Sequence, residues 1–506
     1  MIYKTLVKYR VFFTVLFIAF ILRFSWLGSI PVGLSWDEAA IGYNGFGIAT
    51  VHRDEWLNRM PITFKSFGDY KAAVAIYADA VSTSLLGLNG FAVRFPMAVA
   101  SLITVVATYG IARKMMKQEV FALVAMITVA LSPLNIHFAR IGFESGIAVS
   151  LVSVGTALLL YAADVPWLYL LSGVSFVMSL YAYHSTKIAV PLLLLVLGVW
   201  CFSSIKKQKV WVFLACIVSA LLLFPLAKEM IYGKAVERFS MTSAISTKNN
   251  LKSPGEIGRV ITKNVLTHLD PVFLLFGKTD SLRHGNGTFG ILSYLEFLFV
   301  ISGIFSFWKK KVYRKYSWLF LCVLIGILPA TLSNEVPNSN RIHGIVPWVQ
   351  IIAAFGWMFW YEYFTEKKKK IFVYISIILV VLQTVIYGYW YVHIYTIVAA
   401  KDFQYGYEQA IRYARSKEKD VEKVLLTSAY GQPYIYMVFF KRLTPIQYNQ
   451  GALANYEIRD IKWDEDRNRK SLLLIGTPQE IPANAEHIVK EIYYPDGSVV
   501  FRIVQL

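Results

Sequence analysis

Charged side chains are scarce in this sequence, and their scarcity excludes an ordinary soluble fold. Asp, Glu, Lys and Arg make up 16% of the 506 residues, while 56% are hydrophobic and the mean hydropathy is +0.49. A soluble domain is charged at about a quarter of its positions. The composition therefore predicts an integral membrane protein.

Cysteine is also rare, and the placement of the cysteines excludes a zinc-binding fold and a fold held by disulfides. Cys201, Cys216 and Cys322 lie in or beside apolar runs, without the CxxC or Cys/His spacing of a zinc site. We expect buried or lipid-facing thiols and no disulfide framework. Internal repeats of short period and low-complexity segments are absent as well.

The N-terminus lacks the cleavage site of a secretory signal peptide. Lys4, Lys8 and Arg10 precede the apolar run 11–22, but no small-x-small motif follows it. We therefore expect an uncleaved first helix with its basic end in the cytoplasm.

Lys and Arg give a net charge of +19, yet they fall largely in short clusters between apolar runs. This pattern indicates membrane topology and not a nucleic-acid partner. Taking about 20 apolar residues for one span, we predict eleven transmembrane helices: 11–28, 92–111, 120–135, 146–163, 167–183, 187–204, 210–226, 290–307, 317–332, 342–361 and 371–392. Four of the five inner loops then carry Lys or Arg clusters, as the positive-inside rule requires.

The same topology places three large segments outside the cytoplasmic membrane: 29–91, 227–289 and the tail after about residue 393. In the first of them, Asp37 to Thr50 and Tyr70 to Leu86 are amphipathic, which predicts helices in the interface plane.

The tail has the pattern of a small α/β domain. Residues 407–416 have helical spacing, while 423–427, 471–475 and 499–504 are typical of short strands. We therefore predict a transmembrane domain over 1–392 and a C-terminal extracytoplasmic α/β domain over 393–506.

An acidic pair, Asp37 and Glu38, follows the first span directly, beside Trp36. Neighbouring side chains on a helix point in different directions, so both carboxylates cannot reach one substrate atom. One is a candidate general base, and the other supports it. The competing interpretation is a helix N-terminus capped by Ser35, which is the commoner use of such a pattern.

Basic residues at the predicted outer ends of the spans form the second candidate feature. Lys71 follows Gly68-Asp69-Tyr70 and could hold a phosphate at a helix start, or simply extend to the interface. Arg140 could likewise face a phosphate, or pair with Glu144 at i, i+4. Further pairs of this kind are His184 with Lys187, Arg283 with His284, and Arg341 with His343.

This combination suits a polyprenyl-phosphate sugar as substrate. Breaking the sugar–phosphate bond releases a stabilised phosphate, so cationic donors suffice and no strong general acid is required. The incoming hydroxyl still needs a base, which one carboxylate provides. Glycoside hydrolases differ, because their alkoxide leaving group needs a second carboxyl group as acid.

The motifs resemble the bacterial GT-C glycosyltransferases of the dolichyl-phosphate-mannose protein mannosyltransferase and aminoarabinose transferase group. The resemblance covers most of the membrane part and is carried by Asp37–Asn44, Phe67–Lys71, Phe91–Pro96, Ser132–Asn135, Tyr183–Ser185, Arg283-His284 and Asn340-Arg341. One departure is visible: members commonly have Lys-Pro-Pro where this chain has Lys71-Ala72-Ala73, which removes the rigid residues of a helix start.

The resemblance implies a GT-C fold and an inverting transfer of a hexosyl or pentosyl group. The donor is a polyprenyl-phosphate sugar, and the acceptor is an extracytoplasmic protein, lipid or cell-envelope glycan. Asp37 would be the catalytic carboxylate, with Glu38 beside it and Lys71 as a donor-phosphate ligand. The other expected substrate-binding residues are Asp69, Tyr70, Arg94, Arg140, Glu144, His184, Arg283, His284 and Arg341.

Several points stay open at this stage. Membrane lipids are the other expected partner, no cofactor is assigned, and metal dependence differs within the group, so a divalent cation stays open. The sequence names neither the sugar, nor the carrier lipid, nor the acceptor.

A secondary transporter or flippase of an envelope precursor is the alternative, although its ionisable groups should lie near the bilayer midplane and not at helix ends. A non-catalytic scaffold that binds through its tail is a third interpretation.

Overall fold

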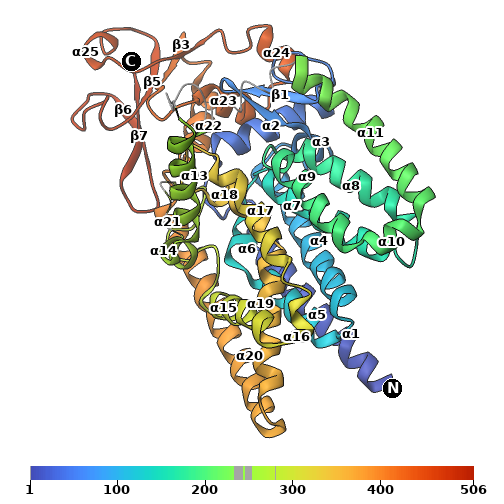
Figure 1. Cartoon of the computed structure of the whole chain (residues 1–506). Coiled ribbons are helices and arrows are strands. Elements are labelled where there is room, and N and C mark those ends of the chain that lie inside the picture. The colour runs from blue at the N-terminus through green and yellow to red at the C-terminus, as the bar shows by residue number, and fades with distance from the viewer. Residues whose placement is uncertain (1, 233–242, 245–252, 278, 280) are drawn as a thin grey trace. The chain divides into compact units, whose positions relative to one another are not determined.

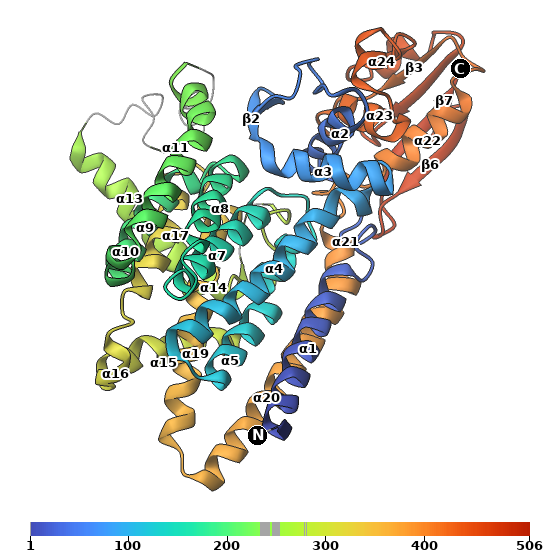
Figure 2. The same cartoon turned by 90° about the vertical axis from the view of Figure 1, so that its right-hand side faces the viewer.

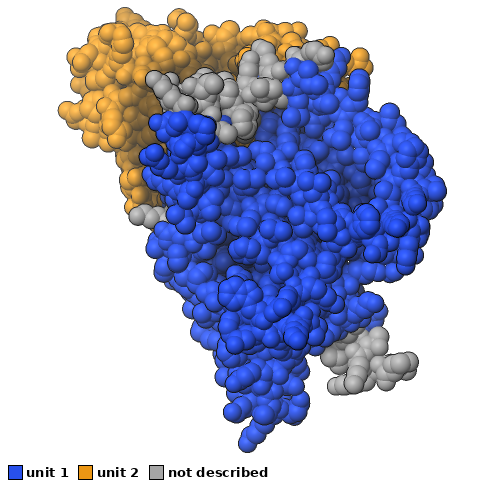
Figure 3. All heavy atoms as spheres, viewed as in Figure 1, with its two compact units in different colours: residues 1–25, 69–74, 97–389 blue, residues 26–68, 75–96, 390–506 orange. Residues whose placement is uncertain are grey.

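The computed structural model describes residues 2–232, 243–244, 253–277, 279 and 281–506 (Figure 1). The chain forms two compact units, coloured separately in Figure 3. Unit 1 contains residues 1–25, 69–74 and 97–389; unit 2 contains residues 26–68, 75–96 and 390–506. Unit 2 thus includes most of the first predicted external loop together with the tail. The division into domains at residue 392 stays a prediction.

The described residues of unit 1 form helices and one named strand, β2 (Asp69–Ala72). Its helices are α1 (Ile2–Phe24), most of α4 (Gly90–Met116), α5 (Glu119–Leu131), α6 (Pro133–Ala139), α7 (Ser145–Tyr161), α8 (Leu168–Ala182), α9 (Thr186–Trp200), α10 (Phe202–Lys207), α11 (Lys209–Tyr232), α13 (Pro254–Leu269), α14 (Pro271–Phe276), α15 (Tyr294–Lys309), α16 (Lys311–Arg314), α17 (Leu319–Thr331), α18 (Ser339–Ile342), the short turn His343–Ile345, α19 (Trp348–Tyr363) and α20 (Glu366–Tyr389).

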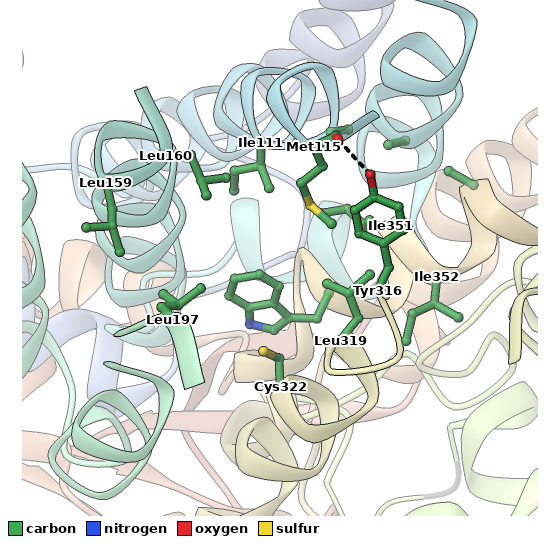
Figure 4. Packing of buried hydrophobic residues seen from close by; sticks show 14 of the residues in the cluster. Ile111, Met115, Leu159, Leu160, Leu197, Tyr316, Leu319, Cys322, Ile351 and Ile352 are labelled. Atoms are coloured by element: carbon green, nitrogen blue, oxygen red, sulfur yellow. Dashed lines mark hydrogen bonds between the residues drawn. The ribbon is translucent and has the colours of Figure 1, made fainter. Parts of the chain in front are cut away.

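The core of unit 1 is built from close helix packing. Helix α1 packs against α5, and α19 packs against both α5 and α15 (Figure 2). Gly303 and Gly356 permit the α15–α19 contact, because a Cβ at Gly356 would lie 1.9 Å from the carbonyl oxygen of Phe299. In the buried cluster drawn in Figure 4, the hydroxyl of Tyr316 donates a 2.9 Å hydrogen bond to the carbonyl of Met115.

Three helices in the described part of the chain are long and apolar enough to cross a membrane: Gly90–Met116, Lys209–Ile231 and Glu366–Val398. Two further helix pairs bend by 55°, and counting each as one span raises the number to five. The predicted continuous helix 120–135 is wrong in detail, because the chain breaks at Ser132 and restarts with Pro133 as the first residue of α6. The total of eleven spans stays a prediction.

Unit 2 contains a mixed five-stranded sheet in the order β4-β3-β5-β7-β6. Strand β3 is parallel to β4 and β5, while β7 is antiparallel to β5 and β6. The strands are β3 (Lys423–Leu426), β4 (Tyr456–Ile458), β5 (Leu472–Gly476), β6 (Ile488–Tyr493) and β7 (Val499–Gln505). The helices and remaining strand are α2 (Trp36–Val51), β1 (Thr63–Ser66), most of α3 (Ala73–Leu86), the start of α4, a π-helical turn (Trp390–Tyr395), α21 (Thr396–Val398), α22 (Tyr407–Lys417), α23 (Pro433–Lys441), α24 (Pro445–Asn449) and α25 (Trp463–Asp466).

The three predicted strands of the tail and its predicted helix are confirmed as β3, β5, β7 and α22. Of the two predicted helices of the first loop, Asp37 to Thr50 is confirmed as α2, and the second needs correction at its start. Helix α2 has no broad exposed face and shares a buried cluster with α22, α23 and the sheet. Residues Tyr70 to Ala72 belong to β2, so the second helix begins only at Ala73.

Candidate functional site

The acidic pair begins α2, and its two members have different surroundings. Ser35 caps the helix: its hydroxyl accepts from the backbone N–H of Glu38 (3.3 Å), and its own N–H donates to Oε2 of Glu38 (2.9 Å). The capping interpretation is therefore confirmed for Glu38. Asp37 lies in the same first turn with a half-buried side chain.

Glu38 also forms an ion pair with Arg94, and both side chains are fully buried. Nε of Arg94 lies 2.8 Å from Oε1 of Glu38. The guanidinium further donates to Oε2 of Glu38 (3.4 Å) and to the carbonyls of Leu27 (3.2 Å), Pro31 (2.8 Å) and Gly33 (2.8 Å). These bonds use all five N–H groups of an arginine. Arg94 thus holds the segment that leads into α2.

Asp79, on α3, is a buried acid that the sequence reasoning missed. Its side chain is fully buried, and within the described residues neither carboxylate oxygen has a hydrogen-bond partner. Burial, with a contribution from the charge of Glu38, raises the pKa of Asp79 well above its usual value. The available signal was an aspartate in the middle of an otherwise small and apolar helix.

Several predicted residues of unit 1 meet around β2. Nε2 of His184 donates to the carbonyl of Tyr70 (3.1 Å), and Oε1 of Glu144 accepts from the N–H of Ala72 (3.1 Å). Nζ of Lys187 lies 3.2 Å from Nδ1 of His184, which fixes Nδ1 as the acceptor. Lys71 lies between these contacts, in β2 and not at a helix start, and it is buried. Asp69 begins the strand and accepts from the N–H of Tyr70 (2.7 Å).

Arg140, Arg283 and His284 are held by other parts of unit 1. Arg140 donates to the carbonyls of Leu22 (2.9 Å) and Ser25 (2.7 Å), at the C-terminal end of α1. Such bonds satisfy carbonyls that a helix end leaves without partners. The carbonyl of Arg283 accepts from Nε2 of His137 (3.2 Å), while the ring of His284 stacks on Phe143 with centroids 5.5 Å apart.

Arg341 lines a narrow cavity of about 40 Å³ in unit 1. Its guanidinium lies 3.7 Å from the exposed carboxylate of Glu335. The walls include the first residues of α7 and α9, Ser145 and Thr186. One and two turns further along these helices the walls become apolar, with Val149, Val152, Val190 and Leu193. The cavity therefore has a polar end at two helix N-termini and an apolar interior.

The predicted site residues are divided between the units. Asp37, Glu38 and Arg94 belong to unit 2, and the other nine belong to unit 1. Among the described residues, no group of three or more His, Cys, Asp or Glu side chains is placed to hold a metal ion.

Comparison with known proteins identifies the class of fold. No family model and no curated protein sequence matches the chain. Solved structures do match over nearly its whole length, and their fold is that of GT-C glycosyltransferases. The chain is accordingly a mostly helical protein with several apolar helices and a C-terminal mixed sheet, as the resemblance implied.

Two solved proteins illustrate the match. The oligosaccharyltransferase of Archaeoglobus fulgidus aligns with a TM-score of 0.52 and 13% identity, covering 98% of this chain and 74% of its own. ArnT from Cupriavidus metallidurans, in its apo state, aligns with a TM-score of 0.51 and 11% identity, covering 99% of this chain and 97% of its own. At such identities the likeness concerns the fold.

Proposed function

We propose that this protein is a membrane glycosyltransferase that moves a sugar from a polyprenyl-phosphate donor to an extracytoplasmic acceptor, with inversion. The fold supports the proposal, because ArnT has been solved with undecaprenyl phosphate and the archaeal oligosaccharyltransferase with a tethered acceptor peptide. The observation that carries it is the cavity beside Arg341, whose lining has a polar, cationic end and an apolar interior.

The polar end of the cavity suits the phosphate. Ser145 and Thr186 begin helices α7 and α9, and the dipoles of these helices favour an anion at their N-termini. Arg341 adds a positive charge, and a guanidinium matches the geometry of phosphate oxygens. The guanidinium of Arg341 and the two helix dipoles therefore favour a phosphate at this end of the cavity.

The apolar interior suits the prenyl chain. It continues from Val149 and Leu193 to Ile325, Val346 and Trp348. A volume of about 40 Å³ is room for roughly one or two water molecules, so a prenyl chain would enter only if the surrounding helices separate. Helices α9 and α17 both contain an internal proline, Pro191 and Pro329, and such positions allow a helix to bend.

In the proposed reaction an acceptor hydroxyl attacks the anomeric carbon of the donor sugar. Asp37 removes the hydroxyl proton as general base. The bond between the anomeric carbon and the phosphate oxygen breaks, and the phosphate leaves with both bonding electrons, stabilised by Arg341 and Lys71. Within unit 2, Glu38 and Arg94 hold the segment that carries Asp37, because their side chains bind each other and neighbouring backbone groups. Within unit 1, Arg140 binds carbonyls at the end of α1.

The test uses purified protein in liposomes with labelled polyprenyl-phosphate sugars and a panel of acceptors. We expect sugar transfer by the wild type and a loss of about 10²- to 10⁴-fold for Asp37→Asn, as for removal of a general base. Asp464→Asn is the matched control, because Asp464 is 89% exposed on α25. Full activity of Asp37→Asn would overturn the assigned role. Movement of the donor across the membrane without transfer would favour the flippase.

A further inference from the structure

The start of α2 is fastened to the C-terminal part of unit 2 by a buried glutamine. The backbone N–H of Trp36 donates to Oε1 of Gln404 (3.2 Å), and Nε2 of Gln404 donates to the carbonyl of Tyr430 (2.9 Å). The N–H of Trp36 is one of the four that an α-helix leaves without an internal partner. Gln404 therefore supplies an acceptor from 368 residues away in the sequence.

A tyrosine completes the junction. The hydroxyl of Tyr436 lies within hydrogen-bond distance of two acceptors, Oε1 of Gln404 and the carbonyl of Leu34, the latter at 2.9 Å. Its ring is buried and stacks on Tyr407, with centroids 4.4 Å apart and an angle of 11°. Because the ring is fixed by this packing, the single proton of the hydroxyl stays between the two acceptors, the amide oxygen of Gln404 and the carbonyl of the residue before the helix cap.

The backbone adopts unusual conformations at Gln404 and at Gly33, on the two sides of the contact between the start of α2 and the C-terminal segment. Gln404 has φ +50°, in the left-handed region that residues other than glycine rarely adopt. Gly33 has φ +78°, and a Cβ there would lie 2.5 Å from the carbonyl oxygen of Phe403. An unfavourable backbone conformation persists only when its surroundings enforce it, and such positions gather at functional sites.

We propose that Gln404 and Tyr436 are positioning residues that set the first turn of α2 and thereby the direction of the Asp37 side chain. The inference rests on the proposed role of Asp37 as general base. The capping box of Ser35 and Glu38 already closes the helix end, so the junction is not needed to start the helix. Its geometric effect is to fix where the N-terminal turn lies against the C-terminal segment.

The experiment compares two tyrosines of one stacked pair. Tyr436→Phe removes the hydroxyl of the junction and keeps the ring. Tyr407→Phe is the matched control, since within the described residues the Tyr407 hydroxyl is buried and has no hydrogen-bond partner. We expect Tyr436→Phe to lower kcat for transfer by about tenfold to a hundredfold, as for small misplacements of a catalytic group, with the donor KM unchanged. Tyr407→Phe should keep wild-type kinetics.

A second pair of variants separates positioning from folding. Gln404→Gly removes the side chain and relaxes the left-handed backbone, whereas Gln404→Glu keeps an acceptor oxygen for Trp36 and Tyr436. We expect Gln404→Gly to lower kcat by more than its loss of folded protein accounts for, and Gln404→Glu to recover part of the loss.

Hydrogen exchange gives a readout that does not depend on catalysis. Amides of residues 36–39 should exchange faster in Tyr436→Phe than in Tyr407→Phe. Equal exchange and equal kcat in the two variants would overturn the positioning role. A loss of kcat that is fully explained by a smaller amount of folded protein would overturn it as well. Wild-type protein that transfers no sugar would instead overturn the proposed function, and exchange would still decide whether the junction holds α2.

Discussion

Glu38 and Asp37 are adjacent in sequence, yet their side chains differ in hydrogen bonding and in burial. Glu38 is bonded to Ser35 and Arg94 and has no exposed surface, while Asp37 is half-buried. The 100° between neighbouring helical side chains predicted that the pair is asymmetric. Sequence could not show which residue is structural, because the partner that decides it, Arg94, lies 56 residues away.

Breaking the buried ion pair should be costly. Arg94→Leu leaves Glu38 as an uncompensated buried charge, and we expect the free energy of unfolding to fall by about 3–5 kcal/mol. Thermal unfolding in detergent measures the change. Arg412→Ala is the control, since Arg412 pairs with Glu408 on an exposed helix face where both side chains are about half or more accessible, and we expect less than about 1 kcal/mol there. Similar shifts for the two variants would contradict the structural role of Arg94.

Arg341 should act on donor affinity. Arg341→Ala removes the charge at the polar end of the cavity, so we expect the KM for the polyprenyl-phosphate donor to rise by at least tenfold, because a charge-assisted hydrogen bond contributes about 1.5–3 kcal/mol. Arg341→Lys should recover part of the affinity, since it keeps the charge but loses the bidentate geometry.

The control for this prediction is Arg259→Ala, on the exposed side of α13. Donor binding by the purified variants, followed as quenching of tryptophan fluorescence, separates affinity from turnover. An unchanged donor KM in Arg341→Ala would remove this residue from the proposed phosphate site.

At the scale of elements, helix α13 is tied to α18, which carries Arg341. Nδ1 of His268 donates to the carbonyl of Asn264 (2.7 Å), and Nε2 accepts from the N–H of Asn338 (3.2 Å), the cap residue of α18. Burial lowers the pKa of His268. The folded protein therefore favours the neutral form of the His268 ring.

This contact predicts a pH dependence. A depressed histidine pKa means that the unfolded or opened state binds the proton more readily, so the stability of the contact falls as pH drops below the unperturbed value of about 6.5. We expect the amide of Asn338 to exchange faster, relative to its intrinsic rate, at pH 5.5 than at pH 7.5. His268→Gln does not titrate and should show no such dependence; an equal pH dependence in that variant would contradict the role of His268.

The sequence predicted some elements well and others poorly, for identifiable reasons. Strands β3, β5 and β7 and helix α22 were found because their apolar residues repeat with a clear period. Strand β4 has three residues, too few to show a period, and β6 is interrupted by Lys490 and Glu491. The burial of α2 was missed because small residues such as Gly42 and Gly45 look weakly apolar, although they permit close contact with Val93 and Asp79.

At the scale of the whole molecule, the membrane orientation is still a prediction that can be tested directly. The positive-inside pattern puts Lys207 in the cytoplasm and the tail outside. Single cysteines at Lys207 and at Asp496 can be tested with a membrane-impermeant thiol reagent, after Cys216, the one free cysteine with an exposed side chain, is replaced by Ser.

We expect intact cells or spheroplasts to be labelled at position 496 and not at 207, and lysed cells to be labelled at both. Cys201 and Cys322 are buried, so a variant without any added cysteine serves as the background. Labelling of position 207 in intact cells would reverse the proposed orientation and, with it, the side of the membrane on which transfer takes place.

Unit 2 is assembled from segments at opposite ends of the chain, 26–68 and 75–96 with 390–506, and this dictates an order during biosynthesis. Roughly 300 residues separate Pro96 from Trp390, which at about 5–20 residues per second is a delay of roughly 15–60 seconds. During that interval the apolar face of α2 has been made but its partners on α22 and α23 have not. The newly made loop must therefore be sheltered, by the membrane surface or by a chaperone, until translation ends. Truncated chains should be degraded even when every predicted span is present.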